Sequence, residues 1–309
     1  MKLGFIKPNY PNEKRVALLP EHINNLETDI YIEKGFGEFF NIDDKEYIQK
    51  GCKILARETL FKECQNIFSL KLIQPSDYDL LSRNHTIIGW THPNGSGRKF
   101  MEEQAIPKDL KIVDLDNIYP RVYYKKKSFE IPFLKKNFIW KNSFMSGISA
   151  TNHALLAFGL IPDQQTKVAI LSSGSVSQGA FNSISKYSAE VRMFYRKTMD
   201  EFKESIDQYD IIINGIEVDV PGLHIISMDD LKRTKKNCLI IDAAADAGNA
   251  IEGTRFTYID NPIYKENDRF FYLVNNAPSI YYKTSSVYIS ESFSKNIYKK
   301  DQLSKILAV

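Results

Sequence analysis

The chain alternates short apolar runs with amphipathic segments, and it does so in two separate blocks. Strand–helix alternation at this spacing is typical of βα units, which build a largely parallel sheet. One block occupies residues 1–115, and the other begins near residue 166. A chain of 309 residues is long enough for each block to bury its own core. The alternation therefore predicts two doubly wound α/β domains.

The same pattern gives bounds for the expected elements. In the first block, strands are predicted over residues 3–6, 30–32, 53–55, 67–70, 86–90 and 111–113. Helices are predicted between them over residues 21–26, 44–51, 58–64 and 97–104. In the second block, the predicted strands are 167–171, 190–195, 211–214 and 238–242, and the helices are 174–185 and 198–206. This order is that of a nucleotide-binding doubly wound sheet.

A more irregular passage, residues 116–163, joins the two blocks. Its basic stretch, residues 121–141, interleaves lysines with aromatic residues, a mixture that can indicate binding of single-stranded nucleic acid. Because lysine plus arginine (41) nearly balances aspartate plus glutamate (38), a solvated loop over a hydrophobic rim is the favoured interpretation. From Asn142 the sequence predicts one long helix with small residues on one face, which ends before Pro162 and could connect two domains across a cleft.

Composition excludes several classes of protein. The first 15 residues lack the apolar run of a signal peptide, and no stretch approaches the roughly 18 apolar residues of a membrane helix. The three cysteines are scattered, and the five histidines show no HxH or HxxxH spacing. A disulfide framework and a metal enzyme are therefore not expected. We expect a cytoplasmic protein with neither a nucleic-acid nor a membrane partner.

The sharpest local signal is KVAILSSGSVSQGAF, which begins at residue 167. An apolar strand runs into a turn of small residues and then into a helix, the context in which backbone N–H groups can approach a pyrophosphate. The three glycine positions of the GxGxxG fingerprint fall on Ser172, Gly174 and Ser177, and Ser175 and Val176 complete the loop. Alone, so degenerate a loop fits a dinucleotide site and an ordinary tight turn equally well.

The end of the next predicted strand bears on the choice of cofactor. An NAD site has Asp or Glu there, about 20 residues after the loop, to accept a hydrogen bond from the ribose. This chain instead continues with Tyr195, Arg196 and Lys197. Arginine and lysine would pair with a 2′-phosphate, which a carboxylate would repel. The strand end therefore favours NADP(H) over NAD(H), with an exposed polar strand end as the alternative.

Two further residues are candidates for chemistry on a carboxylic acid substrate. Arg15 lies in a polar loop just before the run Val-Ala-Leu-Leu-Pro, which is expected to open a helix. An arginine there could hold a carboxylate with two parallel hydrogen bonds, although taken alone a surface arginine is the commoner explanation. His92 follows a predicted strand at its C-terminal end, where α/β active sites lie, but from the sequence alone a structural histidine is the favoured interpretation.

These segments also carry a resemblance to a known family. NEKRVALLPEHI resembles the opening motif of the alanine dehydrogenase and pyridine-nucleotide transhydrogenase family. IDAAADAGNAIEGTRFTYIDNPIY and FYLVNNAPSIYYKTSS resemble the end of that family's cofactor domain. The similarity extends from Met1 to about Ser286 and is poor over residues 116–142. It implies an α/β fold of two Rossmann-like doubly wound domains with mainly parallel sheets, separated by an active-site cleft.

The resemblance assigns roles to individual residues. The family's pyruvate-carboxylate arginine falls on Arg15, its catalytic histidine on His92 and its cofactor-domain aspartate on Asp246. The substrate lysine falls on Lys71 if a small shift is allowed, and on Ile73 in a gapless match.

Two positions concern the cofactor domain and the linking helix. Asn275 joins the residues of the loop and of the basic strand end as an expected cofactor contact. Family members often have a glutamate in the linking helix where this chain has Gly147, so that contact is lost.

The resemblance also implies an activity. The short chain, the SSGSVS loop and the basic strand end are similar to a branch of NADP-dependent oxidoreductases that condense pyruvate with the side-chain amine of ornithine or lysine and reduce the imine with NADPH. Residues 1–140 and 285–309 would form a discontinuous substrate domain, and residues 141–284 the dinucleotide-binding domain. A homo-oligomer, dimer or tetramer, is implied too. The alternatives are an alanine or saccharopine-like dehydrogenase and an inactive nucleotide-binding regulator.

Overall fold

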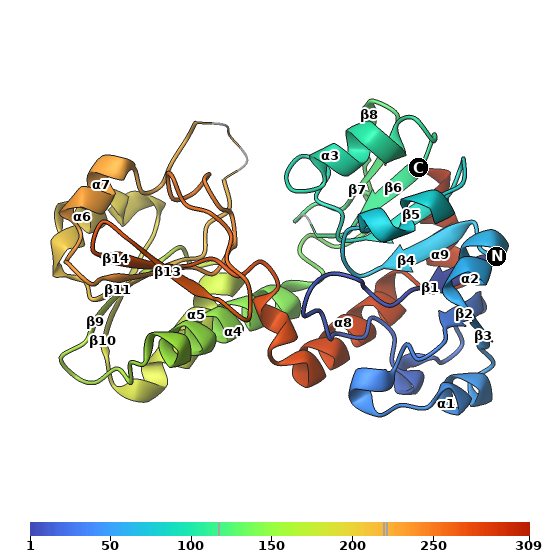
Figure 1. Ribbon diagram of the computed structural model, residues 1–309, viewed down its shortest axis with the longest axis horizontal. Coiled ribbons are helices and arrows are strands. Elements are labelled where there is room, and N and C mark those ends of the chain that lie inside the picture. Colours follow the sequence, from blue (N-terminus) through green and yellow to red (C-terminus); the bar gives the residue numbers. More distant parts are fainter. Residues whose placement is uncertain (117, 219, 221) are drawn as a thin grey trace. The chain divides into compact units, whose positions relative to one another are not determined.

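A computed structural model describes residues 1–116, 118–218, 220 and 222–309 (Figure 1). The chain divides into two compact units. One consists of Met1–Ile139 with Tyr282–Val309, and the other of Trp140–Tyr281. Each unit is an α/β structure built on a mainly parallel sheet, which confirms the fold class that the sequence predicts. Among the helices of the described residues, none combines the length and the hydrophobicity needed to cross a bilayer.

The sheet of the first unit has, among the described residues, eight strands in the order β3-β2-β1-β4-β5-β6-β7-β8. The strands are β1 (Lys2–Phe5), β2 (Asp29–Glu33), β3 (Lys53–Leu55), β4 (Asn66–Ser69), β5 (Thr86–Gly89), β6 (Lys111–Asp114), β7 (Arg121–Tyr124) and β8 (Lys127–Glu130). Strands β1 to β6 pair in parallel, in the order of a doubly wound sheet that changes winding direction between β1 and β4.

Helices cover both faces of this sheet. They are α1 (Asp44–Gln49), α2 (Arg57–Glu63), α3 (Arg98–Phe100), α8 (Tyr282–Asn296) and α9 (Lys300–Ala308). Consecutive residues of a strand point to opposite faces, so Ile87 packs in the cluster with α2 while Ile88 packs in the cluster with α8 and α9. Figure 1 shows these last two helices, in red, beside the blue and cyan strands of the first residues.

The basic stretch predicted as a loop contains a β-hairpin. Strands β7 and β8 are antiparallel to each other, and β7 pairs antiparallel with β6, so the hairpin extends the sheet. The turn between them consists of two lysines, and Lys125 has a φ of 55°. Such turns favour Asn-Gly, and the sequence pattern missed the hairpin because lysines replace that signal.

The helix predicted over residues 21–26 is also wrong. Only one 3₁₀ turn forms, η1 (Pro20–His22), and the chain then takes left-handed backbone at Asn25 (φ 50°) and Glu27 (φ 55°). Tertiary contacts hold this short turn, because the Ser290 hydroxyl of α8 accepts from the Leu19 N–H at 2.8 Å and lies 2.8 Å from His22 Nδ1. Apolar spacing alone could not reveal those contacts.

The second unit contains a six-stranded sheet among its described residues, in the order β10-β9-β11-β12-β14-β13. The strands are β9 (Lys167–Leu171), β10 (Glu190–Phe194), β11 (Ile211–Asn214), β12 (Leu239–Asp242), β13 (Ile263–Glu266) and β14 (Arg269–Tyr272). The helices are α4 (Trp140–Phe158), α5 (Ser175–Ile184), α6 (Met199–Glu204) and α7 (Met228–Arg233). All strands are parallel except β13, which returns antiparallel beside β14.

Helices α4 and α5 cross at very short range, and they lie side by side in Figure 1. A Cβ atom on Gly147 would lie 1.9 Å from the Val176 carbonyl oxygen, and one on Gly179 would lie 2.0 Å from the Phe144 carbonyl oxygen. Each glycine therefore lets the backbone of the other helix approach. Gly147 stands where family members often have a glutamate, and in this chain it has a packing role.

Candidate active site

Four polar residues of the first unit follow the C-terminal ends of neighbouring parallel strands. Arg15 lies on the segment after β1, Lys71 follows β4, His92 follows β5 and Asp116 follows β6. The C-terminal edge of a doubly wound sheet is where ligands bind, and the switch of winding direction between β1 and β4 opens that edge. The topology thus gathers residues that lie up to about a hundred positions apart along the chain.

Arg15 is held by a carboxylate that the sequence analysis did not single out. Its Nε donates to Glu13 Oε1 at 2.7 Å and its Nη2 donates to Oε2 at 2.6 Å, a bidentate pair in which both side chains are buried. The guanidinium also lies over the Trp90 ring, 4.8 Å from its centroid. Burial opposes ionisation of Glu13, but Arg15 outweighs it and holds the pKa of Glu13 below its usual value.

Lys71 is a buried cation close to this pair. Its Nζ lies over the Tyr10 ring, 5.3 Å from the centroid. Burial and the positive charge of Arg15 lower the pKa of Lys71 to about 8, while Glu13 and Asp116 act in the opposite direction. Lys71 is therefore a group whose charge changes slightly above neutral pH.

His92 pairs with Asp116. Its Nε2 lies 3.0 Å from Asp116 Oδ2, and each side chain is 29% exposed. Burial opposes the charged imidazolium, but the Asp116 carboxylate outweighs burial and raises the pKa of His92. His92 has a φ of 43°, and its carbonyl oxygen accepts from the N–H of Gly95 at 3.0 Å and of Gly97 at 2.9 Å. This tight loop after β5 fixes the direction of the imidazole.

Glu13, Asp116 and Tyr10 are the functional candidates that sequence reasoning missed. Glu13 stands two residues before Arg15, and Asp116 stands just beyond the strand that follows His92. The signal for Asp116 was present, since parallel strands end at one edge and a polar residue after β6 should join those after β4 and β5. No such signal was present for Glu13, because the spacing of two residues in a loop does not show that their side chains turn toward each other.

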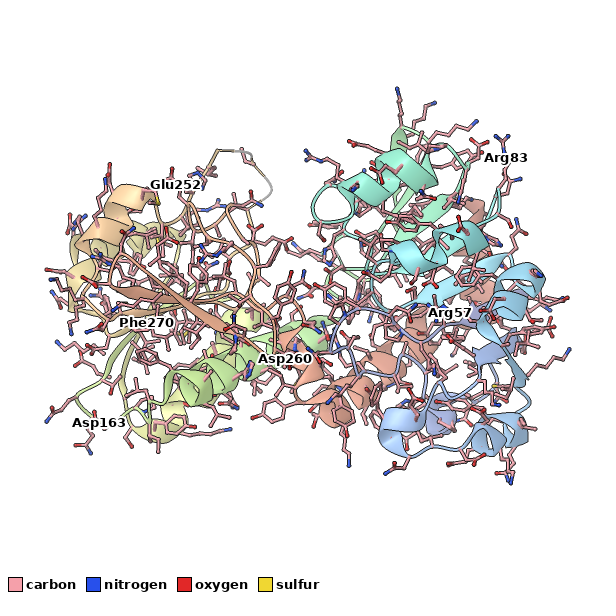
Figure 2. The ribbon with its side chains drawn as sticks, in the orientation of Figure 1. Arg57, Arg83, Asp163, Glu252, Asp260 and Phe270 are labelled. Carbon is pink, nitrogen blue, oxygen red and sulfur yellow. The ribbon has the colours of Figure 1, made fainter. Side chains whose placement is uncertain are left out.

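The segment that carries Arg15 is fixed from two sides. The Ser286 hydroxyl of α8 accepts from the Val16 N–H at 2.9 Å, next to Arg15. On the other side Arg57, labelled in Figure 2, donates to Glu33 at 2.6 Å and to both carboxylate oxygens of Asp77 at 2.8 and 2.7 Å. Asp77 and Glu33 in turn accept from the residues that follow β1. The network holds the loop that carries Glu13 and Arg15 against the edge of the sheet.

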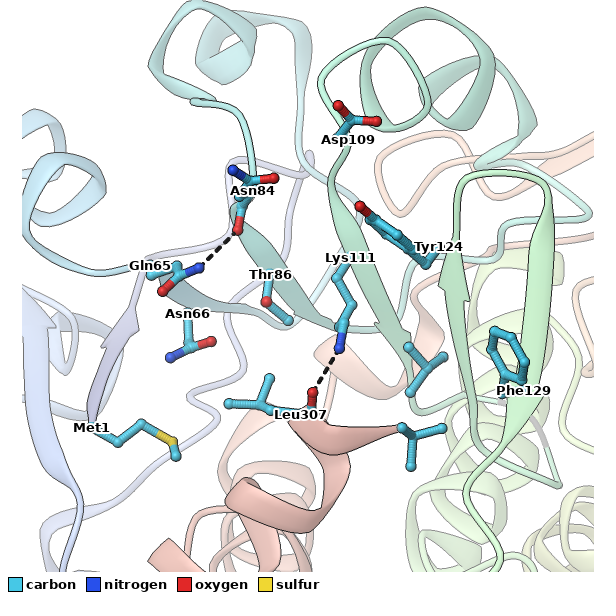
Figure 3. A pocket seen from close by; sticks show the side chains of 12 residues that line it. Met1, Gln65, Asn66, Asn84, Thr86, Asp109, Lys111, Tyr124, Phe129 and Leu307 are labelled. Carbon is cyan, nitrogen blue, oxygen red and sulfur yellow. Dashed lines mark hydrogen bonds between the residues drawn. The ribbon is translucent and has the colours of Figure 1, made fainter.

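A surface pocket lies at the opposite edge of the same sheet (Figure 3). Its polar lining includes Asn66, Thr86 and Lys111, the first residues of β4, β5 and β6. The C-terminal helix closes one side, where Lys111 Nζ donates to the Leu307 carbonyl oxygen at 2.6 Å. The pocket contains none of the predicted site residues, and doubly wound sheets bind ligands at the other edge.

In the second unit, the predicted dinucleotide loop lies between β9 and α5. Ser172 has a φ of 89°, and its hydroxyl accepts from the Gly174 N–H at 3.0 Å. Gly174 is the N-cap of α5, and Ser175 and Val176 begin the helix. Because glycine has no side chain, no N-cap side chain covers the first turn of α5. Ser177 is buried and donates to the Leu171 carbonyl oxygen at 2.6 Å, so it serves the packing of strand on helix.

The basic strand end lies next to this loop. The Ser172 N–H donates to the Phe194 carbonyl oxygen at 2.7 Å, which brings Tyr195 beside the loop. Arg196 and Lys197 follow in a 3₁₀ turn, η6 (Arg196–Thr198), and all three side chains are exposed. Helix α5 has ten residues and begins at this loop, and an exposed cationic turn lies beside it. Both features are suited to binding a nucleotide phosphate.

Asp246 lies on the loop after β12. Its Oδ2 accepts from the Val218 N–H at 2.8 Å, and its Oδ1 accepts from the Asn249 side chain at 2.7 Å. The Asp246 N–H donates at 3.0 Å to Asp242, a fully buried carboxyl. Burial raises the pKa of Asp242 to about 7, although Asn214 and Asp246 donate to it. Asn275, half-buried, lies on the loop after β14.

The structure thus gathers Arg15, Lys71 and His92 in the first unit, where their charges influence one another. Asp246, Asn275 and the candidates for cofactor binding belong to the second unit. Among the described residues no group of three or more His, Cys, Asp or Glu side chains could hold a metal ion.

Comparison with known proteins gives consistent matches over both units. Residues 5–129 match the model of the alanine dehydrogenase/PNT N-terminal domain, and residues 147–307 match that of the C-terminal domain. The chain is 55% identical to N(5)-(carboxyethyl)ornithine synthase of Clostridium botulinum, over 97% of this chain and 95% of that protein. It is 52% identical to the protein of the same name from Lactococcus lactis subsp. lactis, over 97% of each.

Among solved structures, an L-alanine dehydrogenase shares the fold. Its TM-score is 0.78 at 19% sequence identity, and the match covers 100% of this chain and 92% of that one.

Proposed function

The chain belongs to the alanine dehydrogenase/pyridine-nucleotide transhydrogenase family, and we propose that it joins pyruvate to the side-chain amine of ornithine or lysine with NADPH as reductant. The product would be an N-(1-carboxyethyl) amino acid. The observation that carries the proposal is identity of 52% and 55% over nearly the whole chain to two N(5)-(carboxyethyl)ornithine synthases. The cations and the His–Asp pair at one sheet edge supply groups that such a reaction needs.

In this proposal the first unit binds and activates the keto acid. Arg15 and Lys71 offer positive charge to the carboxylate and to the oxygen of the carbonyl, where negative charge develops as the amine attacks. The new C–N bond gives a carbinolamine, and loss of water from it gives an imine. His92 is suited to deliver and remove the protons of these steps, because an imidazole can both donate and accept a proton and the Asp116 carboxylate stabilises its protonated form.

The cofactor is proposed to bind to the dinucleotide-binding domain predicted over residues 141–284, most of which lies in the second unit (Trp140–Tyr281). Residues 1–140 with 285–309 are proposed to form the substrate domain. The small-residue turn Ser172–Ser177 would face the pyrophosphate with backbone N–H groups, and Arg196 and Lys197 would pair with the 2′-phosphate. Bound NADPH would supply the hydride that reduces the imine carbon. Tyr195 lies beside this turn and would flank the adenosine end.

Asp246 and Asn275 are proposed to orient the ribose or the amino substrate. Each Asp246 oxygen already accepts one hydrogen bond, from Val218 or Asn249, and a carboxylate oxygen has room for a second. The existing bonds hold the carboxylate in one direction, which suits a group that must present a lone pair to a ribose hydroxyl or to an ammonium group.

The test is an assay of NADPH oxidation with pyruvate, in which ornithine, lysine and ammonium are supplied separately. Mass spectrometry identifies the product. Oxidation that depends on ornithine or lysine and yields an N-carboxyethyl product would support the proposal and identify the amine. Oxidation with ammonium alone, with alanine as product, would identify an alanine dehydrogenase instead. NADPH binding without turnover for any amine would contradict an enzymatic role with pyruvate.

A further inference from the structure

The indole N–H of Trp90 is buried without an acceptor. Trp90 follows β5 directly, and its side chain is 2% exposed. Among the described residues, Nε1 of Trp90 has no hydrogen-bond partner. More than nine in ten buried polar groups in proteins are partnered, so an orphaned donor requires an explanation. A donor kept for a ligand is one explanation, and the surroundings of Trp90 support it.

Trp90 belongs to the candidate site by its contacts. The guanidinium of Arg15 lies 4.8 Å above the ring, and Glu13 fixes that guanidinium with two hydrogen bonds. Phe293 of α8 packs against the ring at 6.0 Å between centroids. His92 comes two residues later in the chain. The indole is thus held in one orientation next to the cation proposed to face the substrate carboxylate.

The other orphaned groups among the described residues differ in kind. They are the carbonyl oxygen of Gln104 and the hydroxyls of Ser149, Thr151 and Ser294. The three hydroxyls lie on helices α4 and α8, where a change of side-chain rotamer can bring a hydroxyl within reach of a carbonyl oxygen of the preceding turn. An indole N–H has no such freedom, because ring packing fixes its direction. Trp90 therefore presents the one fixed donor in this group.

We propose that the Trp90 N–H donates a hydrogen bond to a carboxylate oxygen of the bound 2-oxo acid. An indole nitrogen only donates, so its partner must be an acceptor. The adjacent guanidinium favours a negatively charged acceptor, and a hydrogen bond to a charged oxygen is stronger than one to a neutral oxygen. The inference rests on the proposed function, in which the first unit binds pyruvate, and it adds a substrate-binding residue that the family resemblance did not assign.

The first experiment replaces the donor and keeps an aromatic ring. In Trp90→Phe, the KM for pyruvate should rise about 10- to 100-fold, the effect expected for loss of one hydrogen bond to a charged group. The Kd for NADPH should stay within about twofold. Because phenylalanine also leaves a gap in the core, a second variant carries β-(3-benzothienyl)alanine at position 90, in which sulfur replaces N–H and the ring size is unchanged. It should show the same rise in KM with an unchanged Tm.

The matched control is Trp140→Phe. The chain contains two tryptophans, and Trp140 is 49% exposed at the start of α4. This variant should keep the KM for pyruvate, and it leaves Trp90 as the sole tryptophan. Titration of pyruvate into Trp140→Phe with NADP⁺ present and amine absent should then change the Trp90 fluorescence with saturation, at a midpoint equal to the Kd for pyruvate.

The outcomes separate the inference from the proposed function. An unchanged KM for pyruvate in the benzothienyl variant would overturn the inference. So would a rise in KM accompanied by an equal loss of NADPH affinity and a lower Tm, because that pattern indicates a structural role. If no amine supports turnover but pyruvate still changes the Trp90 fluorescence with saturation, and the benzothienyl variant weakens that binding as measured by calorimetry, the proposed reaction fails and the inference stands.

Discussion

Charge at the candidate site is set by pairs of side chains, and each pair couples a group that sequence reasoning found to one that it missed. Glu13 occupies the Nε–Nη2 edge of Arg15, and Asp116 faces the imidazole of His92. Buried ion pairs rarely add much net stability, so we expect their value to lie in orientation and protonation. Lys71 shows the consequence, since its pKa responds to Arg15, Glu13 and Asp116 as well as to burial.

Lys71 gives a prediction for pH dependence. Its pKa is lowered to about 8 by burial and by Arg15, so Lys71 is protonated below that pH and neutral above it. If the cation is the active form, kcat/KM for pyruvate falls as the pH rises through about 8. In Lys71→Arg the group stays charged throughout, so the fall near pH 8 should be absent up to about pH 10. Rate profiles from pH 6 to 10 measure this, with the exposed Lys305→Arg as control. The same fall near pH 8 in Lys71→Arg would assign it to another group.

Arg196 gives a prediction for cofactor preference. Its side chain is exposed in the turn beside the dinucleotide loop. In Arg196→Asp, a carboxylate would repel a 2′-phosphate and accept from a ribose hydroxyl, so the ratio of kcat/KM for NADPH over NADH should fall at least about 10-fold. Lys186→Asp, an exposed charge reversal in the same unit, should leave the ratio unchanged. An unchanged ratio in Arg196→Asp would remove the residue from the cofactor site.

Packing between elements depends on backbone approach that only glycine permits. The crossing of α4 and α5 brings Gly147 and Gly179 each against a carbonyl group of the other helix. The closeness matters for the candidate cofactor site, because α5 begins at the loop that would face the pyrophosphate. A displaced α5 would move the backbone N–H groups of its first turn.

Gly147→Ala tests this crossing. The added Cβ would lie 1.9 Å from the Val176 carbonyl oxygen, so the helices must separate. We expect a loss of about 2–3 kcal/mol in the free energy of unfolding, typical of overpacking, measured by urea denaturation. The control is Leu156→Ala, on the same helix at 81% exposure, which should change the free energy of unfolding by less than about 0.5 kcal/mol. A Gly147→Ala variant as stable as the parent would show that the crossing is looser than described.

At the scale of the whole molecule, the last residues complete a core that the first residues begin. Ile289 and Phe293 of α8 and Leu303 and Ile306 of α9 are fully buried with the strands β1, β2 and β4. The Tyr298 hydroxyl also donates to the Ala17 carbonyl oxygen at 3.1 Å. The first unit is therefore discontinuous, and its stability depends on both ends of the chain.

Leu303→Ala tests that dependence. Leu303 is fully buried. Truncating a buried leucine to alanine typically lowers the free energy of unfolding by about 2–5 kcal/mol. Hydrogen exchange should show reduced protection of the amides of β1 and β4, while those of β11 in the second unit keep theirs. Lys305→Ala, at an exposed position of the same helix, is the control and should leave the protection of both groups of amides unchanged. Equal loss of protection in both units would show that the two unfold together rather than separately.

The parallel strands were predictable because hydrophobic alternation is a local property. Strand 211–214 was predicted with the bounds that β11 has, and strand 53–55 with those of β3. The β7–β8 hairpin was missed because its turn lacks a glycine signal and all four residues of β8 are exposed, so β8 shows no apolar pattern. Strands β13 and β14 were also missed. Strand β13 ends in two charged residues and β14 begins with Arg269, so neither shows a long apolar run, and their pairing depends on neighbours elsewhere in the sheet.

The candidate site divides in the same way. Arg15, His92 and Lys71 are candidates that the family resemblance supplies, and the small-residue loop is a candidate from its strand–turn–helix pattern. The partners of these residues cannot be predicted in this way, because burial and pairing are properties of the folded chain. Only the tertiary structure decides that Glu13 closes on Arg15, that Lys71 titrates near pH 8 and that the Trp90 donor is left without an acceptor. Each of these depends on side chains that long-range folding brings within a few ångströms and shields from water.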